Sequence, residues 1–162
     1  MAIGIGAEFR CDDGAGPAVI GRLRGTVPPG VELLCSDGEP TRLMEAWTGA
    51  AAAIVIDAVC GGDAAPGTLH RVVVPAPAPG QAGRPTPGQP GPARAPASSH
   101  GLGLGAAIEL SRALSRLPAL LIVHAVQGEA FGYGQAFSPA VAAAIDELTA
   151  RVRADLLRLS GA

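Results

Sequence analysis

Short apolar runs recur along the chain and predict β-strands. The run at 51–59 is almost uninterrupted, which is typical of a central parallel strand covered on both faces. Residues 68–74 alternate between apolar and polar side chains and follow that run after a short Gly/Pro turn. This pattern favours an edge strand that pairs antiparallel with the strand at 51–59. Three further runs predict strands at 1–6, 31–35 and 118–126.

Segments of helical periodicity separate these runs. We expect helices at 14–24, 41–48, 98–117 and 139–159. The last is the clearest, because Ser138 precedes Pro139 at the favoured first helical position. Its apolar residues recur at helical spacing: Val141, Ile145, Leu148, Val152 and Leu156. The alternation predicts an α/β three-layer sandwich, with a twisted, mostly parallel sheet of about five strands, one antiparallel edge strand, and helices on both faces.

Residues 75–97 differ from the rest of the chain in composition. They are rich in Pro and Gly and contain almost no apolar side chains. Such a segment cannot bury enough surface to order itself, so we expect a mobile loop here. No composition shift elsewhere indicates a boundary, and the sequence predicts a single domain over 1–162.

Composition excludes several functional classes. All 12 basic residues are Arg and lie scattered, so no basic patch for nucleic acid is expected. We find no charged leader and no long apolar segment, which argues against a signal peptide and a membrane span. The three cysteines are widely spaced without a C-x-x-C, so neither a disulfide framework nor a structural zinc site is expected. These features favour the cytoplasm.

The turn after the first strand carries the first candidate chemistry. It holds two adjacent acids, Asp12 and Asp13, at the strand end where α/β sheets bind ligands. A dinucleotide fingerprint is disfavoured, since Phe9 replaces the third glycine and the acids would repel a pyrophosphate. Asp is also a preferred helix N-cap, so one of the two acids has a purely structural alternative.

Two further residues are expected at the same sheet edge. Asp57 follows the apolar residues of the strand at 51–59, where a carboxylate is costly unless it is paired or bound to a metal. Its alternative role is to cap a turn through backbone amides. His100 lies after the Pro/Gly-rich segment, and its alternative is a capping or exposed histidine. With Asp13, these residues would offer mixed oxygen and nitrogen ligands, which suit nickel, zinc, manganese or iron.

The other two histidines are weaker candidates. His70 is predicted on the edge strand. His124 lies within an apolar strand and is expected to be a core residue with a hydrogen-bond partner.

An ordered set of motifs resembles the hydrogenase maturation proteases, from Ile3 through the helix at Pro139. No single motif is decisive, but the ordered set is specific: Gly4-Ile5-Gly6, Asp12-Asp13-Gly14-x-Gly16-Pro17, Ile56-Asp57-Ala58, Pro66-Gly67-Thr68-x-His70-Arg71 and Ser98-Ser99-His100-Gly101-Leu102. The family's fold is a twisted, mostly parallel sheet between helices. Its members are endopeptidases that trim a C-terminal peptide from the precursor of the nickel–iron hydrogenase large subunit.

The resemblance implies specific roles for three residues. The family's two metal-binding acids fall on Asp13 and Asp57, and its histidine falls on His100. It also implies that the nickel is carried by the precursor rather than held as a tightly bound cofactor. Two departures bear on activity or substrate choice. Ala7 replaces the family's usual asparagine, and residues 37–40 read Asp-Gly-Glu-Pro where Asp-Gly-Gly is common.

The resemblance predicts a peptidase, with hydrolysis that is either metal-assisted or aspartic-like. The sequence shows no G-x-S-x-G nucleophile elbow, which argues against an acyl-enzyme. A second hypothesis is a non-catalytic module that holds nickel or the nickel-loaded precursor as a maturation checkpoint or chaperone. A third is an unrelated metal-dependent hydrolase of the same fold.

Overall fold

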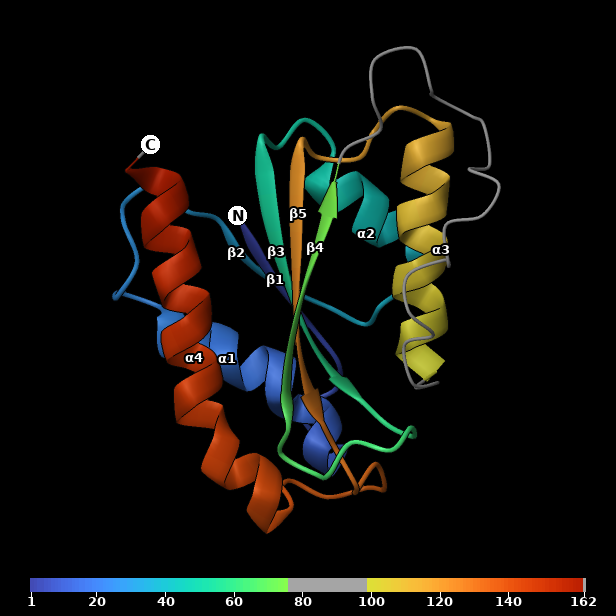
Figure 1. Ribbon diagram of the computed structural model, residues 1–162, viewed down its shortest axis with the longest axis vertical. Helices are drawn as coiled ribbons and strands as arrows, with labels where there is room; N and C mark the ends of the chain where they lie inside the picture. Colours follow the sequence, from blue (N-terminus) through green and yellow to red (C-terminus); the bar gives the residue numbers. More distant parts are fainter. Residues whose placement is uncertain (76–98, 162) are drawn as a thin grey trace.

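A computed structural model describes residues 1–75 and 99–161, with the side chains of residues 99–102 left undescribed. Figure 1 shows one sheet with helices on both of its faces. The strands are β1 (Ala2–Ile5), β2 (Leu33–Ser36), β3 (Ala52–Val59), β4 (Leu69–Pro75) and β5 (Leu120–Gln127). The helices are α1 (Ala15–Leu23), α2 (Pro40–Trp47), α3 (Ser99–Ala113) and α4 (Pro139–Ser160), with a short 3-10 helix, η1 (Cys11–Gly14), before α1.

The sheet has the order β2-β1-β3-β5-β4, and only β4 is antiparallel to its neighbour. The predicted fold class is therefore confirmed, including the antiparallel edge strand. One detail of the prediction is wrong, because β4 pairs with β5 and not with the strand that precedes it in the chain. β5 is largely buried and takes a central place, whereas Val72 and Val73 of β4 are about half exposed, which suits an edge.

The two faces of the sheet bury separate apolar clusters. One cluster lies between the sheet and α1 with α4, and includes Ile54, Ile56 and Ile122. The other lies between the sheet and α2 with α3, and includes Val55, Val74 and Leu121. Side chains of a strand alternate between faces, so the parity of a residue in β3, β4 or β5 fixes the cluster that it faces.

Most helix and strand boundaries agree with the sequence to within two residues. The exception is α3, which ends at Ala113, four residues before the predicted end. Ser115 has a φ of 55°, a left-handed conformation that does not continue a helix. The mobile loop predicted at 75–97 lies, apart from Pro75, outside the described residues.

Candidate functional site

Close backbone packing positions the turn between β1 and α1. Gly6 has a φ of 129°, and a Cβ added there would stand 1.8 Å from the backbone oxygen of Asp13. A Cβ on Gly16 would stand 2.3 Å from the Ile5 oxygen. Only glycine permits these approaches, so the two glycines hold η1 and the start of α1 directly against the end of β1.

Asp13 lies in η1, at the carboxyl end of β1. Its side chain is buried, and Oδ2 accepts a hydrogen bond of 3.1 Å from the backbone N–H of Ala7. The contact uses only the backbone of residue 7. Replacing the family's usual asparagine with Ala7 therefore leaves this support of Asp13 in place.

Asp57 lies near the end of β3, beside β1 in the sheet. It is 1% exposed; Oδ1 accepts a 2.8 Å hydrogen bond from the N–H of Ala58, and Oδ2 has no partner among the described residues. Burial, with a smaller contribution from the negative charge of Asp13, raises the pKa of Asp57 to about 7 against the lowering effect of the Ala58 N–H. The structure thus brings Asp13 and Asp57 together at the carboxyl edge, while their roles as ligands remain predictions.

His100 lies in the first turn of α3, and its side chain is among those that the structure leaves undescribed. In Figure 1 this end of α3, drawn in yellow, points toward the edge at which β3 and β5 end. The amino end of α3 therefore lies toward the edge where the two acids stand. The role of its imidazole stays a prediction.

Asp12 has a structural role that the sequence did not indicate. Its Oδ2 accepts hydrogen bonds of 2.9 Å from the N–H groups of both Glu129 and Ala130, and its Oδ1 accepts one of 2.7 Å from that of Ser138. The N-capping alternative is wrong, since no side chain caps η1 or α1. Asp12 instead fastens the connection between β5 and α4 to the turn that carries Asp13.

His124 is a core residue with a hydrogen-bond partner, as predicted. It lies on the face of the sheet opposite to Asp57. Its Nε2 is 2.8 Å from Oδ2 of Asp155 in α4. Arg71 of β4 also donates to this carboxylate, at 2.8 Å from Nε. These contacts of Asp155 join α4 to β5 and to the edge strand β4.

Two other buried polar atoms lack a partner among the described residues, Nε2 of His70 and Oε1 of Gln127. His70 lies on the edge strand β4, as predicted, and Gln127 ends β5. Their position relative to Asp57 depends on strand register, which local sequence patterns do not reveal.

The chemistry of the acidic pair is that of proton transfer and cation binding. A carboxyl group with a pKa near 7 can take up or release a proton at neutral pH, as a general acid or base does. Among the described side chains, no three from His, Cys, Asp and Glu form a group able to hold a metal ion. Any cation held by Asp13 and Asp57 therefore takes its remaining ligands from elsewhere.

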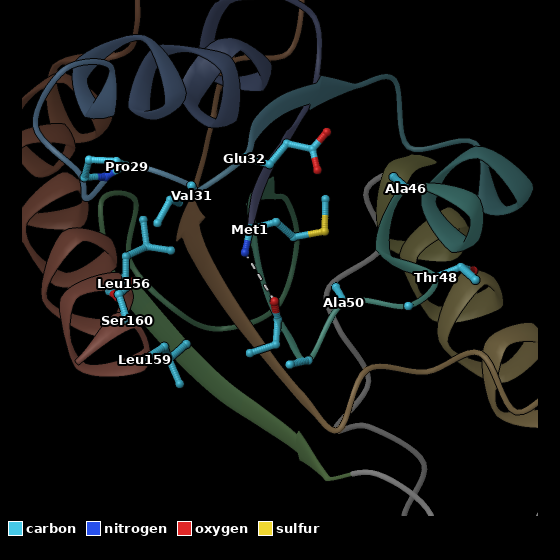
Figure 2. A pocket seen from close by; sticks show the side chains of 14 residues that line it. Met1, Pro29, Val31, Glu32, Ala46, Thr48, Ala50, Leu156, Leu159 and Ser160 are labelled. Atoms are coloured by element: carbon cyan, nitrogen blue, oxygen red, sulfur yellow. Dashed lines mark hydrogen bonds between the residues drawn. The ribbon is translucent and has the colours of Figure 1, made fainter. Parts of the chain in front are cut away.

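A hollow at the opposite end of the sheet is not the candidate site. It lies at the amino ends of β1 and β3, where Met1, Glu32 and Leu159 line it (Figure 2). Its lining contains one ionisable side chain, that of Glu32, and no histidine or cysteine. It offers none of the chemistry found at the carboxyl edge.

Solved structures show what this fold resembles. The hydrogenase maturating endopeptidase HybD from E. coli superposes with a TM-score of 0.79 and 24% identity, over 99% of this chain and 92% of that one. The [NiFe] hydrogenase maturation protease HybD from Thermococcus kodakarensis gives 0.66 and 18%, over 96% and 97%. The hydrogenase 2 maturation peptidase from a Thaumarchaeota archaeon gives 0.64 and 21%, over 96% and 95%.

The chain therefore has the fold of these hydrogenase maturation endopeptidases along nearly its whole length. No protein-family model matches the sequence, and neither does any curated protein. None of the described helices is both long and apolar enough to cross a bilayer.

Proposed function

We propose that this protein is an endopeptidase that removes a C-terminal peptide from the nickel-loaded precursor of a nickel–iron hydrogenase large subunit. The likeness to solved maturation endopeptidases, which covers 99% and 96% of this chain, supports the proposal. The ordered motifs of the sequence support it independently.

The observation that carries the proposal is the pair of buried acids at the carboxyl edge. Asp13 follows β1 and Asp57 lies in β3, and these two strands are neighbours in the sheet. The charge of Asp13 acts to raise the pKa of Asp57. An unpartnered buried carboxylate oxygen costs roughly 1 to 3 kcal/mol or more of stability. A fold that keeps such an atom at its ligand-binding edge is suited to function rather than to stability.

In this proposal the nickel arrives as part of the substrate. Asp13, Asp57 and His100 bind it and so place the scissile peptide bond at the sheet edge. A carboxylate of the pair takes a proton from the attacking water, whose oxygen bonds to the peptide carbonyl carbon. The C–N bond then breaks, and the proton passes to the departing amine.

The test is the intact mass of a precursor incubated with the purified protein. Nickel-loaded precursor is expected to lose one defined C-terminal fragment, whereas nickel-free precursor stays whole. Asp57→Asn and Asp13→Asn keep the side-chain size and remove the charge. We expect each to slow cleavage by about 100- to 10,000-fold, the range of general acid–base contributions.

Asp146→Asn is the matched control, since that side chain is 89% exposed on α4 and lies outside the site. It is expected to cleave at the wild-type rate. A precursor that stays whole but co-elutes with the wild-type protein would replace the peptidase with a binding checkpoint. Cleavage that persists in Asp57→Asn would remove this carboxyl group from the mechanism.

A further inference from the structure

Three buried polar atoms lack partners in the described chain, and each can offer a lone pair, the imidazole nitrogen when its ring proton is on Nδ1. They are Oδ2 of Asp57, Nε2 of His70 and Oε1 of Gln127. Gln127 and Asp57 are almost fully buried. Leaving such atoms unpaired costs free energy at each of them, so an arrangement that keeps three near one sheet edge needs an explanation.

Strand register places these residues on one face. Asp57 of β3 and His70 of β4 both pair with the same residue of the strand between them, Ala125 of β5. Residues paired across neighbouring strands point to the same side of a sheet, so Asp57, Ala125 and His70 form one row. Gln127 lies two positions beyond Ala125 and therefore shares its face.

That face is the one covered by α2 and α3. Val55, two positions before Asp57, belongs to the cluster on this side, and so does Val74, four positions after His70. The middle of the row is the small methyl group of Ala125. The row spans two strand separations, about 10 Å between the outer backbones. A side chain from each outer strand needs to reach only part of that distance to meet an ion whose bonds are about 2.1 Å long.

The chemistry of the three atoms favours a cation over other ligands. Gln127 already donates its amide N–H to the backbone oxygen of Gly61 at 3.0 Å, which leaves its carbonyl oxygen as the unused group. A carboxylate oxygen, an imidazole nitrogen and an amide oxygen all donate electron pairs to a metal. One divalent cation can satisfy the three together, and the mixed set suits a borderline metal.

We infer that Asp57, His70 and Gln127 bind a divalent cation, with His70 supplying an imidazole nitrogen. The inference deepens the proposed function, because this site shares Asp57 with it. It rests on the proposed function only for the identity of the cation. His70 is then a cation ligand in its own right, on a different strand from the acids.

The experiment is a titration of the purified full chain with Co²⁺ and Ni²⁺, without any precursor. Calorimetry gives affinity, and the visible absorption of bound Co²⁺ reports the number and type of ligands. We expect one ion per chain in the wild type. His70→Ala is expected to weaken binding by about 10-fold or more and to change the Co²⁺ spectrum, and Gln127→Leu to weaken it less.

Val72→Ala is the matched control, because Val72 lies on the same strand and the same face, one row farther from the edge. It is expected to leave affinity and spectrum unchanged. Thermal melting confirms that each variant is folded, and His70→Gln is used in place of the alanine variant if the latter unfolds.

Two results would overturn the inference: a wild-type chain that binds neither ion, or a His70 variant that binds as the wild type does. Precursor cleavage plays no part in these readouts. A failure of the proposed peptidase activity is therefore distinguishable from a failure of this site.

Discussion

Two buried carboxylates lie on opposite faces of the sheet and behave in opposite ways. Asp57 is 1% exposed and Asp155 is 3% exposed. Burial raises the pKa of Asp57 to about 7, and the hydrogen bond from the Ala58 N–H opposes that shift. Burial also acts to raise the pKa of Asp155, but hydrogen bonds from Arg71 and His124, with their charges, hold it below its ordinary value.

The partners of Asp155 explain the contrast. An ionised carboxylate only accepts hydrogen bonds, so Nε2 of His124 carries the proton in their 2.8 Å contact. Arg71 and Arg158 complete the neutralisation at 2.8 Å each. Equal burial therefore does not imply equal roles. The carboxylate with several partners stabilises the fold, and the one whose Oδ2 has no partner among the described residues is kept at a cost.

The largest expected effect on stability comes from removing the partnered acid. Asp155→Ala leaves His124 buried without its partner and Arg71 without its counter-charge. We expect a loss of about 3 to 5 kcal/mol in the free energy of unfolding, measured in urea. Asp146→Ala, which removes a mostly exposed acid from the same helix, is expected to change it by less than about 0.5 kcal/mol. A loss below about 1 kcal/mol for Asp155→Ala would erase the contrast.

The second prediction concerns how stability depends on pH at Asp57. Between the ordinary Asp pKa of about 3.9 and the folded value of about 7, the folded chain holds a proton that the unfolded chain has released. Raising the pH across this window therefore destabilises the fold, by up to about 1.4 kcal/mol per unit, and the effect ends above pH 7.

Asp57→Asn removes that dependence. Unfolding in urea at pH 5, 6, 7 and 8 should show the variant gaining stability relative to the wild type as pH rises to 7, with a constant difference beyond. Titration of His124 and Asp155 is common to both proteins and cancels. A difference that stays constant from pH 5 to 8 would mean that Asp57 titrates at its ordinary pKa.

The smallest expected effect separates the partners of Asp155 from each other. Arg158 forms an ion pair with Oδ1 of Asp155 at 2.8 Å, but its side chain is 73% exposed. Arg158→Ala should therefore cost less than about 1 kcal/mol. Arg71→Ala should cost more, because Arg71 contacts both carboxylate oxygens and is less exposed. If Arg158→Ala cost more stability than Arg71→Ala, Arg158 would be the main partner of Asp155.

Much of the fold was predictable because local patterns determine it. The apolar run of β3 indicated a central strand, and Pro139 marked the start of α4. The convergence of Asp13 and Asp57 followed from parallel neighbours meeting at one edge. The place of β5 between β3 and β4 was missed, because partner choice depends on burying both faces of a strand that comes much later in the chain.

Two features of the carboxyl edge depend on contacts between distant parts of the sequence, including the pairing of β5 with β4. The row of Asp57, Ala125 and His70 exists only because β5 lies between the other two strands. The role of Asp12 depends on N–H groups 117 to 126 positions away in sequence. No periodicity within either segment encodes such a partner.

The hydrogen bonds of Asp12 also determine when, during synthesis, the turn that carries Asp13 can be held in place. The turn that carries Asp13 is fastened to residues 129–138, which a ribosome adds more than 100 residues later. β5, which separates Asp57 from His70, is likewise made late. A nascent chain holding only the first two thirds of the sequence thus has its acids but no assembled edge. The carboxyl edge that carries Asp13 and Asp57 is therefore assembled only when the chain is nearly finished.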